Sequence, residues 1–182
     1  SRSRSKGRLA CAGSSFRVES ARMAAKPQIA MGVSAASVPP VIIGTVGRSE
    51  LIDRLVATGQ LDGSKLVGKW ESFIIATVAK PVPGVERALV IAGSDKRGTI
   101  YGIYELSRQI GVSPWHYWAD APVAHHAELH VKPGAFASGE PKVKYRGIFI
   151  NDEAPALRRW AQEKFGGMGP KFYGHVFELL LR

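Results

Sequence analysis

The chain has 182 residues, which is enough for one full domain or for one domain and part of another. Hydrophobic residues make up 45% and charged residues 22%, as in ordinary globular proteins, and no apolar run approaches the roughly 20 residues that a membrane span requires. The net charge is +10, but residues 1–26 hold seven basic residues and one acidic residue, so the other 156 residues carry only +4.

Residues 1–38 therefore hold most of the net positive charge, and they show no periodic hydrophobic pattern. This composition predicts a disordered tail or a misread start. A nucleic-acid-binding arm is the alternative, but the rest of the chain has no basic stripe interleaved with aromatic residues, so we expect neither a nucleic-acid nor a membrane partner. No apolar signal-peptide core follows the basic residues. The single cysteine, Cys11, excludes an internal disulfide framework.

Residues 39–133 predict a mixed α/β domain with the order β-α-β-β-α, in which helices pack on a small sheet. The first strand is expected at residues 41–45, before a helix with Ser49 as its N-cap and Gly59 just beyond its end.

The next two strands of this domain are expected at residues 71–78 and 88–92, with Pro81 ending the first of them. The second helix is expected from Thr99 to Ile110. Residues 128–131 are a candidate for one more strand.

Residues 134–142 are rich in Pro and Gly and predict a linker at a domain boundary. Beyond it, the apolar run Ile148 to Ile150 is typical of a buried strand, which we expect over residues 143–150. Helical patterns follow at 156–164 and 172–181. The last pattern is still amphipathic at Arg182, so we expect the chain to be a piece of a longer protein.

Three polar residues, Asn151, Asp152 and Glu153, follow the apolar run directly. Adjacent carboxylates at the end of a buried strand are unfavourable unless they lie at an open edge, and in parallel α/β folds ligands bind at that edge. The alternative is that Asp152 or Asn151 caps the following helix.

The loop from Gly93 to Gly98 connects a predicted buried strand to a helix and contains Lys96 and Arg97. The free N–H groups at such a helix start bind anions, and the two cations could hold a phosphate or carboxylate. The spacing is neither a P-loop nor a dinucleotide-binding fingerprint. The alternative is a capped helix with a solvated Lys-Arg pair.

Aromatic residues are concentrated between Trp115 and Trp118, which predicts either a sugar-stacking surface or a packing hinge between layers. The five histidines have no metal-ligand spacing, and no serine or cysteine nucleophile signature is present. We therefore expect no cofactor and no metal.

Several longer motifs occur in this order: residues 41–45 (VIIGT), 68–73 (GKWESF), 92–104 (AGSDKRGTIYGIY), 117–120 (YWAD) and 144–153 (KYRGIFINDE). Together they resemble glycoside hydrolase family 115, whose members are xylan α-1,2-glucuronidases that remove glucuronic acid or its 4-O-methyl ether. The resemblance covers roughly residues 40–182.

This resemblance implies an α/β class fold: a partial N-terminal mixed α/β domain at residues 39–133, then the first β/α unit of a truncated (β/α)8 barrel at 143–182. It implies an inverting mechanism acting on glucuronoxylan or acidic xylo-oligosaccharides, without a cofactor. Asn151, Asp152, Glu153, Lys96 and Arg97 are the implied substrate-binding residues; the catalytic acid and base are unassigned. The chain alone is expected to be inactive. Full-length members are expected to be secreted or periplasmic and can dimerise. A non-catalytic carbohydrate-binding or interaction module is the alternative.

Overall fold

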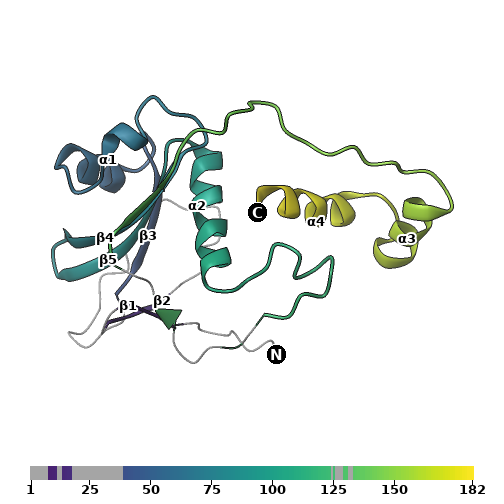
Figure 1. Cartoon of the computed structure of the whole chain (residues 1–182), viewed down its shortest axis with the longest axis horizontal. Helices are drawn as coiled ribbons and strands as arrows, with labels where there is room; N and C mark the ends of the chain where they lie inside the picture. Colours follow the sequence, from purple (N-terminus) through teal and green to yellow (C-terminus); the bar gives the residue numbers. More distant parts are fainter. Residues whose placement is uncertain (1–7, 12–13, 18–38, 124, 126–128, 131–132) are drawn as a thin grey trace.

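A four-stranded mixed sheet is the centre of the computed structural model, which describes residues 8–11, 14–17, 39–123, 125, 129–130 and 133–182 (Figure 1). Its strand order is β3-β5-β4-β7. Strand β3 (Val41–Thr45) pairs parallel with β5 (Val85–Gly93), while β4 (Phe73–Val82) is antiparallel to β5. Strand β7 (Ala135–Ser138) pairs antiparallel with the first four residues of β4. The prediction of a mixed α/β fold is thus confirmed.

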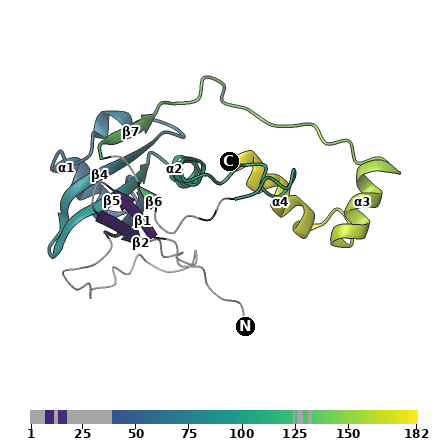
Figure 2. The same ribbon diagram turned by 60° about the horizontal axis from the view of Figure 1, so that its bottom comes forward.

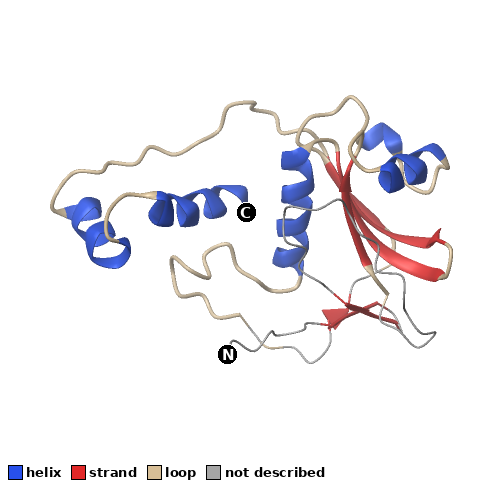
Figure 3. Ribbon diagram, turned by 180° about the vertical axis from the view of Figure 1, so that it is seen from behind, coloured by secondary structure: helices blue, strands red, loops and turns tan. Residues whose placement is uncertain are grey.

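Each face of this sheet is covered by one helix (Figure 1). Side chains alternate along β4 and β5 because successive residues of a strand point to opposite faces. Ile74 and Val90 pack with α1 (Glu50–Ala57) in one core cluster, whereas Ile75 and Ile91 pack with α2 (Lys96–Gln109) in another. Figure 3 shows the sheet and the helices on its two faces from behind. A short 3-10 turn, Gly63–Lys65, lies between α1 and β4.

The predicted β-α-β-β-α order is confirmed, with different boundaries. Ser49 is the N-cap of α1 and accepts a hydrogen bond from the Ile52 N–H at 3.4 Å, and Gly59 follows the helix with a positive φ of 73°. Strand β4 continues through Pro81, which was expected to end it. Proline is tolerated there because the pairing with β5 is irregular between Ala79 and Val82 and because β7 reaches only the start of β4.

Strand β7 lies inside the predicted linker at 134–142, so the sheet reaches further along the chain than expected. Two contacts hold it there: the Thr77 N–H donates to the carbonyl of Gly134 at 2.9 Å, and the ring of Phe136 packs on Phe73 with centroids 6.0 Å apart. Strand pairing within the predicted linker thus ends at Ser138.

Two strands, β1 (Arg8–Cys11) and β2 (Ser14–Arg17), occur in the predicted disordered tail, where no strand was expected. Strand β1 pairs antiparallel with β2 and parallel with β6 (Leu129–His130), which falls within the strand expected at 128–131. The other residues of the predicted tail lie outside the described ones.

The strand predicted at residues 143–150 is not formed in this chain. The segment is extended but pairs with none of the described strands, and it runs from the sheet towards α3 (Figures 1 and 2). Tyr145 is 85% exposed and Phe149 91% exposed, so the apolar run is not buried. A strand needs a hydrogen-bonded neighbour, and none of the described residues supplies one.

The last part of the chain forms two helices, α3 (Ala156–Phe165) and α4 (Pro170–Leu181), close to the expected positions. They share a third apolar cluster, centred on Phe172 and Ala161, to which Trp118 and Ile150 also contribute. The end of α4 lies near α2, where the Arg182 guanidinium stacks on the Tyr104 ring at 4.6 Å. In the described part of the chain, no helix is both long and apolar enough to cross a bilayer.

Candidate functional site

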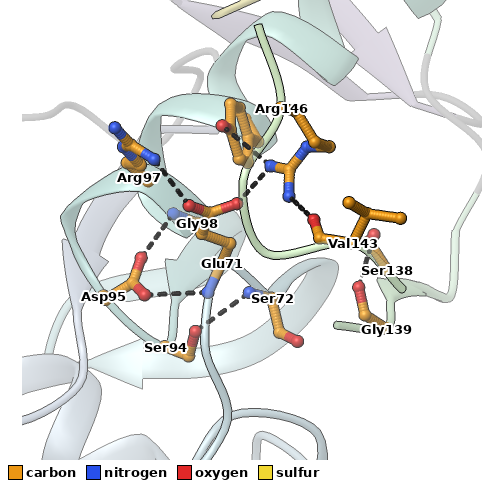
Figure 4. A network of polar contacts seen from close by, with 11 residues as sticks. Glu71, Ser72, Ser94, Asp95, Arg97, Gly98, Ser138, Gly139, Val143 and Arg146 are labelled. Carbon is orange, nitrogen blue, oxygen red and sulfur yellow. Dashed lines mark hydrogen bonds and ion pairs between the residues drawn. The ribbon is translucent and has the colours of Figure 1, made fainter. Parts of the chain in front are cut away.

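The loop before α2 is a dense polar junction (Figure 4). Asp95 is the N-cap of α2: its Oδ1 accepts from the Gly98 N–H at 2.8 Å, and its Oδ2 accepts from the Glu71 N–H at 2.8 Å. Helix α2 and the loop before β4 approach so closely that a Cβ on Gly98 would lie 2.1 Å from the carbonyl oxygen of Ser72. Only glycine fits this position without displacing backbone.

Glu71 is the buried acid at this junction, with 7% of its surface exposed. Its Oε1 accepts from Arg97 at 2.9 Å and its Oε2 from Arg146, so each carboxylate oxygen has its own guanidinium (Figure 4). Burial alone raises the pKa of a carboxyl, but the hydrogen bonds from Arg146 and Arg97 outweigh it and hold the pKa of Glu71 below 4.5. Glu71 is therefore ionised at neutral pH.

The backbone of Glu71 is also unusual, because its φ is +50°. A residue with a side chain rarely adopts this left-handed conformation, and it persists only where the surroundings enforce it. Here the N–H is held by Asp95, and the next residue, Ser72, exchanges two hydrogen bonds with Ser94. The loop at 71–72 is thus locked to the loop before α2.

Arg146 comes from the extended segment after β7 and reaches back to this junction. Besides Glu71, it donates to the carbonyl of Val143 and, at 3.4 Å, to the Tyr101 hydroxyl of α2. Its guanidinium also lies 5.9 Å from the centre of the Trp70 ring. Segments at 70–71, 97–101 and 143–146 are therefore joined around one buried carboxylate.

The two predicted cations, Lys96 and Arg97, both lie in the first turn of α2. Arg97 is 64% exposed but is engaged by Glu71, which differs from the expected solvated pair; Lys96 is exposed. The expected cap is confirmed, since Asp95 supplies it. Binding of a carboxylate by these cations stays a prediction.

The three polar residues at 151–153 are exposed. The Asn151 Oδ1 accepts from the Glu153 N–H at 3.1 Å, a local turn. Helix α3 has Pro155 as its N-cap and no side-chain cap bond, so the alternative in which Asp152 or Asn151 caps that helix is wrong. The segment that carries them leads away from α2 towards α3, so these residues are not brought together with Lys96 and Arg97 (Figures 1 and 2).

The aromatic run has two different environments. Trp118 is partly buried and packs on Trp160 and Phe172, with ring centroids 5.8 and 6.5 Å apart, as a packing hinge does. Tyr117 stacks on His175 at 4.0 Å with an angle of 2° between the rings. Trp115, by contrast, is 53% exposed and is accessible to a ligand.

These residues can hold fixed charges in place and bind a ligand. Within the described ranges, no three His, Cys, Asp or Glu residues come together as a metal site. Glu71 is held ionised between two arginines, so it is a poor proton donor or acceptor. Sequence reasoning missed Glu71 and Arg146 as partners because 75 residues separate them; both nevertheless lie inside the motifs at 68–73 and 144–153 that carry the family resemblance.

Comparison with known proteins points to one enzyme family. Residues 138–182 match a family model described as glycosyl hydrolase family 115. Among the eleven matching chains of known structure is a family 115 4-O-methyl-α-glucuronidase with specificity for decorated arabinogalactans. It is 39% identical, with a TM-score of 0.60 over 78% of this chain. No match was found among curated proteins. This chain spans 18% of the length of that enzyme. The resemblance to family 115 is thereby supported.

Proposed function

We propose that this chain forms part of a family 115 glycoside hydrolase that removes α-1,2-linked glucuronic acid, or its 4-O-methyl ether, from xylan. One observation carries the proposal: the segment that holds Asn151, Asp152 and Glu153 lies within residues 138–182, which match the family model. The 39% identity to a 4-O-methyl-α-glucuronidase across 78% of the chain supports the same activity.

In the complete enzyme, residues 143–150 are the first strand of a (β/α)8 barrel and α3 begins the surrounding helices. The exposure of Tyr145, Ile148 and Phe149 supports this assignment, because barrel strands are paired on both edges and their apolar side chains are covered. Barrel enzymes hold their sites at the carboxyl ends of the strands. Asn151, Asp152 and Glu153 would then face the substrate.

The reaction is hydrolysis by an inverting mechanism, in which one carboxylic acid protonates the leaving oxygen and a carboxylate activates water across the ring. Within the described residues, Asp152 and Glu153 serve as binding groups for the uronate sugar, with Asn151. Lys96 and Arg97 are the proposed partners of the uronate carboxylate; this requires the complete enzyme to bring the segment at 151–153 towards the start of α2, from which it leads away in this chain. No acid or base is assigned among them.

The substrate class follows from the shared sugar. The similar enzyme is specific for decorated arabinogalactans, whereas our proposal for this chain is glucuronoxylan or acidic xylo-oligosaccharides. Both polymers can carry a terminal glucuronosyl group, so the two substrates differ in their polysaccharide main chain. The complete enzyme is proposed to act outside the cell or in a periplasm, and to dimerise.

By itself, this polypeptide should release no 4-O-methyl-glucuronic acid from glucuronoxylan above a heat-killed control. The described residues contain an extended segment where a closed barrel would need paired strands. Release above the control would contradict this part of the proposal.

A chimera tests the proposed activity. Residues 39–182 would replace the corresponding segment of the similar 4-O-methyl-α-glucuronidase, and uronic acid release from a decorated arabinogalactan and from glucuronoxylan would be measured. We expect release from at least one polymer, and release from glucuronoxylan if the xylan assignment is correct. A folded chimera without release from either polymer would refute the function.

A non-catalytic carbohydrate-binding module is the second candidate, and the exposed ring of Trp115 is the observation that favours it. It requires that the 182-residue chain binds acidic xylo-oligosaccharides and loses the binding on Trp115→Ala. Calorimetric titration of both proteins distinguishes the two functions.

A further inference from the structure

The extended segment between β7 and α3 is attached at few places to the sheet domain, which is the four-stranded sheet with α1 and α2. Glu140 accepts from the Trp70 N–H at 3.1 Å and lies 3.5 Å from the Lys69 Nζ. Arg146 contacts Glu71 and Tyr101. From 147 to 149 every residue is exposed, until Ile150 packs in the cluster of α3 and α4. Arg146 is therefore the last polar anchor, in the described chain, before the residues at 151–153.

Glu71, which binds Arg146, is held rigidly. Glu71 is buried, its φ is +50°, its N–H is held by Asp95, and Arg97 occupies the carboxylate oxygen that Arg146 leaves free. With both oxygens engaged, the carboxylate has one orientation in which to meet Arg146. An enforced left-handed residue that carries a buried, doubly paired acid is costly to build for packing alone.

We propose that Glu71 is a positioning residue, which binds Arg146 and thereby sets the path of the chain towards Asn151, Asp152 and Glu153. The role of those three residues rests on the proposed function, but the contact itself does not. Arg97 serves in this arrangement as the second clamp on Glu71. The sheet domain would thus orient the segment that carries the substrate-facing residues.

The test measures local mobility in the 182-residue chain. A nitroxide label is attached at Phe149→Cys in a Cys11→Ser background, because Phe149 is exposed and lies three residues after Arg146. We expect Glu71→Gln and Arg146→Gln each to shorten the rotational correlation time of the label at least two-fold. The double variant should equal either single variant, since both remove the same contact.

Glu163→Gln is the matched control, because Glu163 is also paired with an arginine, Arg159, but on the exposed face of α3. It should leave the label unchanged. Thermal unfolding of every variant identifies general destabilisation. Arg146→Gln decides the case if Glu71→Gln lowers overall stability, since Arg146 is at the surface. Unchanged mobility in Arg146→Gln, or additive effects in the double variant, would overturn the proposal.

The chimera and the label experiment test the proposed function and the positioning role of Glu71 separately. If the chimera releases no uronic acid but the label responds as expected, Glu71 positions the segment and the assigned activity is wrong. If the chimera is active and the label does not respond, the activity stands and the positioning role is wrong.

Discussion

Replacing Trp118 by alanine should loosen the helical unit of α3 and α4 from the loop that follows α2. The indole packs on Trp160 and Phe172 and stands edge-on to Tyr117, with centroids 5.5 Å apart. These rings join three separate segments into one apolar cluster. Removing the indole leaves Phe172 and Trp160 with a gap that the neighbouring helices cannot fill without moving.

The magnitude follows from the partial burial of this side chain. A fully buried tryptophan costs about 3–5 kcal/mol when truncated to alanine, and Trp118 is only partly buried. We therefore expect a loss of about 2–3 kcal/mol in the free energy of unfolding of the helical unit. Far-UV circular dichroism in a urea titration measures it, because α3 and α4 both contribute to the helical signal.

Trp115→Ala is the matched control, since Trp115 is more than half exposed and has no ring partner among the described residues. It should change the free energy of unfolding by no more than about 0.5 kcal/mol. If Trp118→Ala proves equally neutral but abolishes binding of an acidic xylo-oligosaccharide, the packing assignment is wrong and Trp118 is a sugar-stacking residue.

Three further predictions follow from the polar junction and the extended segment. Gly98→Ala should cost at least about 2 kcal/mol, because its Cβ would lie 2.1 Å from the Ser72 carbonyl oxygen; an unchanged urea midpoint would contradict the close approach of α2 to this loop. The Glu71 carboxylate should stabilise the fold fully above pH 4.5 and progressively less as the pH falls through its lower folded-state pKa. The difference in free energy of unfolding between the parent and Glu71→Gln should therefore shrink on acidification. A difference that stays constant with pH would refute the ion pairs with Arg97 and Arg146. Phe149→Ser should change stability by less than about 0.5 kcal/mol in this chain, since the ring is 91% exposed; a large loss would show that the segment is buried.

The elements predicted correctly are those whose signals are local. Ser49 and Gly59 mark the ends of α1 through hydrogen bonds and a backbone conformation that involve only near neighbours. The continuous apolar character of β5 reports burial on both faces, which the two helices on the sheet provide. Neither needs knowledge of distant residues.

The predictions fail where partners distant in the sequence determine the local structure. Residues 135–138 look like a linker by composition, but pairing with β4 makes them a strand. Ile148 to Ile150 look like a strand, yet no described residue pairs with them. Glu71 and Arg146 are 75 residues apart, so no local pattern in a single sequence could join them. The candidate residues at 151–153 were identified from their place after an apolar run, and their role stays a prediction.

Substrate affinity of the chimera is the most direct test of the central claim that residues 151–153 face the uronate sugar. Asn151→Ala and Glu153→Ala should each raise KM for the uronate-bearing substrate at least about ten-fold, since a hydrogen bond to a charged group contributes about 1.5–3 kcal/mol. Glu163→Ala, at an exposed acid on α3, should leave KM unchanged. If KM is unaltered in both Asn151→Ala and Glu153→Ala, the segment does not contact the substrate and the claim is wrong.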